Sequence, residues 1–127
     1  VSTMPTKFDE KIVLRILDKG AISLDLDALG IPQRERQRIV DAAERPFGMI
    51  FTTGPTGAGK TTTMYALLTM LNKGDVNIMT IEDPIEYELP GINQVAVNVE
   101  QGLTFDVALR GFLRQDPDVI MVGEVRD

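Results

Sequence analysis

A glycine-rich stretch near the middle of the chain has the residue types and spacing needed to hold a phosphate group. It reads Gly54, Pro55, Thr56, Gly57, Ala58, Gly59, Lys60, Thr61 and Thr62, and its first eight residues match the pattern G-x-x-x-x-G-K-[ST]. Glycines let backbone N–H groups turn toward a phosphate, and a following helix adds its free N-terminal donors. Lys60 would reach the β- and γ-phosphates, and the Thr61 hydroxyl would ligate Mg²⁺. The stretch predicts a nucleotide site.

The residues around this stretch supply the context that the motif requires. The apolar run Met49, Ile50 and Phe51 precedes it, and a helical pattern of apolar residues follows it up to about Asn72. We therefore expect a strand over 48–53, a phosphate loop, and then a helix. The competing interpretation is an ordinary glycine-rich turn between a strand and a helix.

Carboxylates follow two further predicted strands. A strand over 76–81 ends in Glu82 and Asp83, and a strand over 118–122 is followed by Gly123 and Glu124. Ligands of an open α/β sheet lie beyond the carboxyl ends of its strands, so we expect these acids to gather around the phosphate loop.

Phosphoryl transfer to water would give these acids their roles. It needs Mg²⁺ to neutralise phosphate oxygens and a carboxylate to orient or deprotonate the attacking water. Glu124 is the predicted catalytic carboxylate, and Glu82 is predicted to assist it and to help Thr61 hold the metal. Asp83 is expected to contribute to nucleotide binding. The plainer alternatives are charges at strand ends and an Asp-Pro turn with a solvated glutamate.

The alternation of short apolar strands with helices from residue 48 onward predicts an α/β fold with a mostly parallel sheet. The other expected elements are strands over 11–17 and 92–99, a short helical piece over 26–29, and helices over 33–45 and 104–115.

The composition excludes several classes of function. The chain has 127 residues and a net charge of −6, which argues against nucleic acid as the main partner. It has no Cys and no His, so this stretch offers neither a cysteine-based zinc site nor a histidine general base. No apolar run approaches the length of a membrane span, and the first residues do not form a signal peptide. Membrane association would have to come through a partner.

Three blocks of the sequence, at 54–63, 80–87 and 113–127, together resemble the secretion ATPase superfamily. The most similar branch is that of the type II secretion and type IV pilus assembly ATPases (the GspE/PilB family). The resemblance implies a RecA-like P-loop NTPase fold that binds ATP with Mg²⁺ and hydrolyses it to power secretion or pilus assembly. It places the phosphate loop at 54–61, the Asp box at 82–86 and an atypical Walker B motif at 119–124. Glu124 would be the catalytic glutamate.

The resemblance also implies how the chain is organised and where it works. Residues 1–22 would be the tail of a preceding N-terminal domain with its linker, and residues 23–127 the first part of the ATPase domain. Arg15 matches an arginine that is expected to reach a nucleotide across a subunit boundary. Family members form hexameric rings at the cytoplasmic face of the inner membrane, where they act on a membrane platform protein.

Some features of the family are not found in this sequence. Its histidine-containing block, its cysteine-rich zinc module and its N-terminal docking domain have no counterpart here, so we interpret the chain as a fragment whose sheet lacks later strands. An unpaired sheet edge and uncovered apolar surface destabilise a domain. The isolated 127-residue chain should therefore be poorly stable and show little ATPase activity, and strong turnover by a monodisperse monomer would contradict this expectation.

Other functions remain open on the sequence alone. A pilus retraction ATPase would share the same motifs. A small-molecule kinase would need a basic lid over its acceptor, and no such segment is visible. A nucleotide-binding switch would not need Glu124 at a strand end, and a RecA-like nucleic-acid motor is disfavoured by the acidic charge balance.

Overall fold

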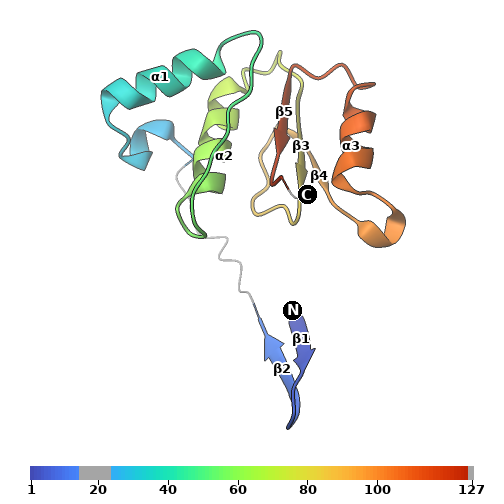
Figure 1. The fold of residues 1–127 in the computed structure, drawn as a ribbon. Helices are drawn as coiled ribbons and strands as arrows, with labels where there is room; N and C mark the ends of the chain where they lie inside the picture. The colour runs from blue at the N-terminus through green and yellow to red at the C-terminus, as the bar shows by residue number, and fades with distance from the viewer. Residues whose placement is uncertain (15–23, 126–127) are drawn as a thin grey trace.

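The computed structural model describes residues 1–14 and 24–125 (Figure 1). The described elements in chain order are β1 (Ser2–Pro5), β2 (Glu10–Val13), η1 (Leu26–Leu29), α1 (Gln33–Ala43), α2 (Lys60–Leu71), β3 (Ile78–Glu82), β4 (Asn93–Ala96), η2 (Val99–Gln101), α3 (Phe105–Phe112) and β5 (Val119–Val122).

A three-stranded parallel sheet with the order β4-β3-β5 organises the body of the protein. Its central strand β3 is buried at every residue. Helix α2 covers one face of this sheet and α3 covers the other (Figure 1). Burial on both faces explains why the apolar residues Ile78, Met79 and Ile81 do not alternate with exposed polar ones. The predicted α/β class and parallel sheet are confirmed.

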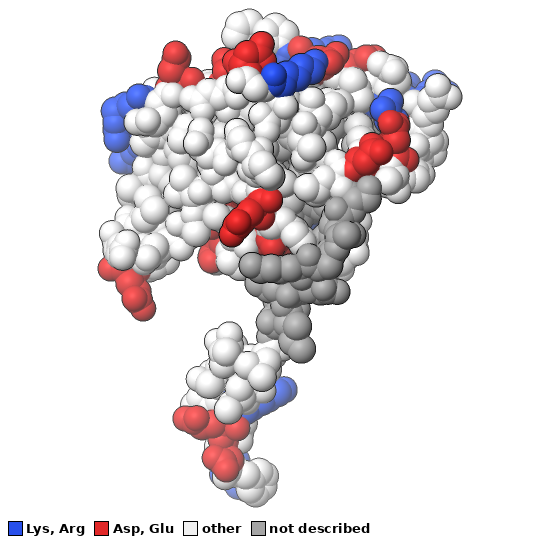
Figure 2. Space-filling view, turned by 180° about the vertical axis from the view of Figure 1, so that it is seen from behind, with Lys and Arg blue, Asp and Glu red and all other residues white. Residues whose placement is uncertain are grey.

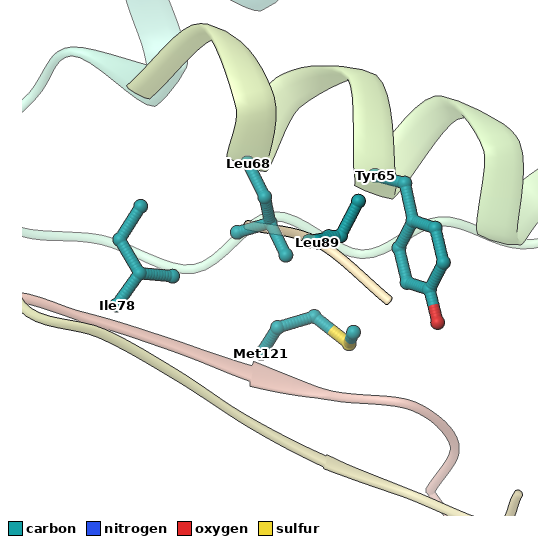
Figure 3. Close-up of a cluster of buried hydrophobic side chains, with 5 residues drawn as sticks. All are labelled: Tyr65, Leu68, Ile78, Leu89 and Met121. Atoms are coloured by element: carbon teal, nitrogen blue, oxygen red, sulfur yellow. The ribbon is translucent and has the colours of Figure 1, made fainter. Parts of the chain in front are cut away.

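The two faces of β3 pack against different helices because successive side chains of a strand point in opposite directions. Ile78 joins Tyr65 and Leu68 of α2, together with Leu89 and Met121, in one core cluster (Figure 3). On the opposite face, α3 packs with the cluster Met79, Ile81, Ala108 and Phe112. Thr80 and Glu82 follow Ile78 at two-residue steps, so their side chains share the face that is covered by α2.

Helix α1 and the short helix η1 pack on the outer side of α2. Leu26 of η1 and Leu67 of α2 are buried together, with Ile39, Val40 and other apolar side chains of α1 against them. The helix predicted over 33–45 and the short helical piece over 26–29 are confirmed.

The N-terminal residues form a hairpin of their own, in which β1 pairs antiparallel with β2. Every residue of both strands is exposed. The strand predicted over 11–17 is present as Glu10–Val13, and its part from Arg15 onward lies outside the described residues. Sequence reasoning missed β1 and the turn between the strands, where the Thr6 N–H donates to the Asp9 carbonyl over 2.8 Å.

The strand predicted over 48–53 was wrong, because the structure has no strand there. The segment contains the exposed side chains of Met49 and Phe51, the latter 71% exposed. A groove of about 440 Å³ lies between this segment, α2 and β5, and β5 pairs only with β3 among the described strands. Because the groove separates this segment from the open edge of β5, the backbone of 48–53 joins no ladder, whatever the β-propensity of its side chains.

The face shown in Figure 2 carries charges of both signs. Figure 2 shows acidic and basic side chains mixed along the upper edge of one face, with uncharged side chains across its middle. Within the described residues, no helix is long and apolar enough to cross a membrane.

Candidate functional site

The predicted phosphate loop leads directly into helix α2, as the motif requires. The helix begins at Lys60. The residue before it, Gly59, has a φ of 85° and has no side chain that could cap the first N–H groups of the helix. Gly57, with a φ of 79°, is also left-handed, a conformation that costs a side-chain-bearing residue energy. The first N–H groups of a helix have no intrahelical acceptors, so this helix start can offer them to an anion.

The Lys60 ammonium closes the loop on itself. Its Nζ donates to the carbonyl oxygens of Gly54 and Pro55, each over 2.8 Å. The Ala58 N–H donates to the Pro55 carbonyl over 3.2 Å, which completes the tight turn. The charge of Lys60 is therefore held across the loop by two neutral acceptors, and a phosphate oxygen would be a stronger partner for it.

A cavity of about 500 Å³ separates the loop from the ends of β3 and β5. The predicted site residues that line it are Thr56, Gly57, Gly59, Lys60, Thr61, Thr62, Glu82, Asp83 and Glu124. Gly54, Pro55 and Ala58 belong to the loop but do not line the cavity. The structure thus brings the loop and all three predicted acids to one place. Arg15 lies outside the described residues.

Glu82 is held at the floor of this site by three donors that the sequence analysis did not identify. Its side chain is only 3% exposed. Its Oε2 accepts a hydrogen bond from the Tyr65 hydroxyl. Its Oε1 accepts from the Thr80 hydroxyl over 2.6 Å and from the Gln94 amide over 3.1 Å. A buried carboxylate needs such partners because burial without them is costly.

The sequence did contain a signal for one of these donors. Tyr65 lies one turn before Leu68 on the buried face of α2, and a tyrosine hydroxyl that is buried there requires a polar partner. Burial raises the pKa of Tyr65 far above the usual tyrosine range. The hydrogen bond to Glu82 and the negative charge of the Glu82 carboxylate raise the pKa of Tyr65 further. The phenol therefore stays protonated and remains a donor.

Gly123 lies where many P-loop enzymes have an aspartate, and the packing explains the glycine. Its N–H donates to the Ile81 carbonyl over 2.8 Å. A Cβ atom at Gly123 would lie 3.2 Å from that carbonyl oxygen and 3.3 Å from the Cα of Glu82. A larger residue would push the end of β5 away from β3, and it would displace both Glu124 and Glu82.

The donor set fits a metal ion that arrives with a nucleotide better than one held by the protein alone. Among the described residues, no group of three or more acidic, histidine or cysteine side chains is arranged to hold a metal. Mg²⁺ in phosphate sites takes one or two protein ligands and completes its shell with phosphate oxygens and water. Thr61 lines the cavity and fits that role. Both oxygens of Glu82 already accept hydrogen bonds, so its role as a metal ligand stays a prediction.

Taken together, the fold and the site define an α/β protein with a phosphate-loop arrangement at the carboxyl edge of a parallel sheet. The profile of the family described as "Type II/IV secretion system protein" matches residues 1–127. The chain belongs to this family.

Curated relatives agree with this assignment. The chain is 55% identical over its whole length to "Type II secretion system protein E" of Pectobacterium carotovorum subsp. carotovorum, of which it covers 26%. It is also 55% identical to "Type IV pilus assembly ATPase PilB" of Pseudomonas aeruginosa, of which it covers 22%. The chain thus spans about a quarter of the length of the curated relatives that it matches.

Solved structures show the same relationship. The crystal structure of the pilus retraction motor PilT with bound ADP superposes with a TM-score of 0.78 at 37% identity, over 98% of this chain and 36% of that one. The Legionella pneumophila ATPase DotB superposes with a TM-score of 0.65 at 29% identity, over 81% of this chain and 29% of that one.

The close packing of Gly123 can be tested by a pair of glycine substitutions. Gly123→Ala should lower the free energy of unfolding by about 1–3 kcal/mol, because the new methyl group meets backbone atoms. Gly111→Ala in α3 is the matched control, since a Cβ there meets nothing within 4 Å, and it should stabilise by about 0.5–1 kcal/mol. Urea unfolding measures both changes. An unchanged stability for Gly123→Ala would contradict the packing argument.

The raised pKa of Tyr65 predicts a loss of stability at alkaline pH. An unfolded tyrosine ionises near pH 10, whereas the folded Tyr65 resists ionisation. Its contribution to stability is therefore fully present below about pH 10 and declines as the pH rises above that value. Difference absorbance of the phenolate between wild type and Tyr65→Phe should show Tyr65 ionising only together with unfolding. Ionisation of Tyr65 in the folded protein near pH 10 would refute this.

Proposed function

We propose that this chain binds ATP with Mg²⁺ and hydrolyses it as part of a motor that powers type II secretion or type IV pilus assembly. The observation that carries the proposal is the single cavity that joins the glycine-rich loop to Glu82, Asp83 and Glu124. Support also comes from relatives that include a pilus assembly ATPase and from the similarity to a motor structure with bound ADP. The parallel sheet with helices on both faces is consistent with a RecA-like P-loop NTPase.

In this proposal the loop and Lys60 bind the phosphates. Lys60 exchanges its two carbonyl acceptors, Gly54 and Pro55, for oxygens of the β- and γ-phosphates. The N–H groups at the start of α2 point toward the same phosphates, and Thr61 and Thr62 line the cavity beside them. Mg²⁺, when bound, neutralises phosphate oxygens, and Thr61 would be its main protein ligand.

The proposed catalytic groups lie across the cavity from the loop. Glu124 follows β5 and is half-buried, which suits a carboxylate that accepts a proton from an attacking water. Glu82 is the proposed second carboxylate, held at the floor of the cavity by its three donors. Asp83 is exposed at the rim and is proposed to contact the nucleotide.

The wider setting is proposed on the family resemblance. The hairpin β1–β2 forms a separate two-stranded sheet, which supports assigning residues 1–22 to the tail of a preceding domain and residues 23–127 to the ATPase domain. The whole protein would act as a hexamer at the cytoplasmic face of the inner membrane, on a platform protein of the machine. Arg15 would contribute to a nucleotide site across the subunit boundary.

Pilus retraction is a second candidate function, because the retraction motor PilT superposes over 98% of the chain. The sequence identities favour assembly or secretion. The chain is 55% identical to an assembly ATPase and 55% identical to a type II secretion protein, whereas it is 37% identical to PilT. A kinase or a switch that does not hydrolyse ATP is less consistent with Glu124 at the end of β5.

Two substitutions in the intact protein separate nucleotide binding from hydrolysis. Lys60→Ala should weaken ATP binding by roughly 10–150-fold, since it removes charged hydrogen bonds that are worth about 1.5–3 kcal/mol. Glu124→Gln should keep ATP binding and lower kcat by about 10²–10⁴-fold, because the amide cannot accept the proton. Equilibrium binding of a fluorescent ATP analogue and phosphate-release kinetics measure the two quantities.

Glu100→Gln is the matched control, because Glu100 is exposed in η2 and does not line the cavity. It should change neither quantity. Normal hydrolysis by Glu124→Gln would refute the catalytic assignment, and unchanged ATP binding by Lys60→Ala would refute the phosphate loop.

A further inference from the structure

We propose that Tyr65 is a positioning residue whose hydroxyl ties Glu82 and the acidic loop after β3 to the helix that carries Lys60 and Thr61. The inference rests on the proposed ATPase function and extends it to a residue outside the phosphate loop and the strand-end acids. Through Tyr65, the phosphate-binding end of α2 and the carboxylate side of the cavity become one rigid unit.

The hydroxyl of Tyr65 makes two links between these segments. The side chain is fully buried, at 0% exposure, and reaches from α2 toward the sheet (Figure 3). Its O–H donates to Oε2 of Glu82, the last residue of β3. The same oxygen accepts the backbone N–H of Glu86 over 3.3 Å. One hydroxyl therefore fixes both the end of the strand and the loop that follows it.

The ring of Tyr65 adds a third link to the same loop. It packs edge-on against Tyr87, with ring centroids 6.3 Å apart and an interplanar angle of 88°. This is the arrangement that aromatic pairs prefer. Glu82, Glu86 and Tyr87 all lie at the end of β3 or just after it, and Glu82 and Glu86 both line the cavity.

The position of Tyr65 along α2 connects this anchor to the phosphate site. Thr61 and Tyr65 are four residues apart in the same helix, so they lie one above the other on one helix face. Thr61 lines the cavity with Lys60. A shift of the start of α2 would therefore be carried to Glu82 through the short stretch of helix from Lys60 to Tyr65 and one buried hydrogen bond.

Packing alone does not account for the hydroxyl, since phenylalanine would fill the same apolar space. Glu82 has three side-chain donors, but they belong to different elements. Thr80 is in β3 itself and Gln94 is in the neighbouring strand β4. Of the three, Tyr65 alone comes from α2, so its hydroxyl is the donor that couples the carboxylate to the phosphate-binding helix.

The test compares Tyr65→Phe with Thr80→Val in the intact protein. Each change removes one hydroxyl from a side chain that is fully buried and donates to Glu82, so each should lower Tm by a similar amount. Tyr65→Phe should lower kcat by about 10-fold or more, because small displacements of reacting groups are costly. It should leave KM for ATP within about threefold. Thr80→Val should lower kcat several-fold less.

Rescue and the double substitution complete the test. Tyr65→4-aminophenylalanine restores a donor at the same place and should recover most of the lost kcat. If Tyr65→Phe fails to fold, this variant should still fold and have a kcat close to that of the wild type. In a Glu82→Gln background, Tyr65→Phe should cause little additional loss of kcat, because the two residues act through one contact. The inference is overturned by equal kcat losses for Tyr65→Phe and Thr80→Val, by a folded but unrescued 4-aminophenylalanine variant, or by fully multiplicative losses with Glu82→Gln.

A measurement without nucleotide keeps this inference separable from the proposed ATPase activity. Hydrogen exchange of the amides at 83–88, that of Glu86 above all, should be faster in Tyr65→Phe than in wild type and nearly unchanged in Thr80→Val. If the wild-type protein fails to hydrolyse ATP, the proposed function fails while the exchange result still decides the anchoring. Unaltered exchange in Tyr65→Phe would overturn the anchoring even in an active ATPase.

Discussion

The buried carboxylate of Glu82 is the constraint on which the rest of the site depends. Strand β3 is enclosed by α2 and α3, and Glu82 ends it with only 3% of its surface exposed. A charge in such a place must be surrounded by donors. Those donors come from α2, β3 and β4. The donor from α2 links the end of β3 to the helix that begins at the phosphate loop.

Much of this arrangement was predictable because its signals are local. The spacing of glycines before Lys60 predicts the loop, and the apolar runs that end in Glu82 and Glu124 predict two strands of the parallel sheet. The gathering of Glu82 and Glu124 at one edge follows from sheet topology, whereas the loop is brought to them by the packing of α2 on the sheet. The donors of Glu82 could not be derived in the same way. They depend on the register in which α2 and β4 meet β3, and sequence periodicity does not specify that register.

The failed strand at 48–53 has a different physical origin. Its side chains have the β-propensity that the prediction used, but a strand exists only where a second segment accepts its backbone hydrogen bonds. In the described chain, β5 is paired on one side, and a groove lies between β5 and this segment. The sequence thus indicates the β-propensity of this segment correctly, but it does not indicate whether β5 pairs with it.

Gly123 shows how the same constraint accounts for an unusual motif. Because β3 and β5 are paired and the Gly123 N–H donates to the Ile81 carbonyl, a Cβ at Gly123 would lie 3.3 Å from the Cα of Glu82. An aspartate before Glu124 would therefore compete for space with the carboxylate that already occupies this edge of the sheet. The buried glutamate that ends β3 thus leaves room only for a small residue between β5 and Glu124.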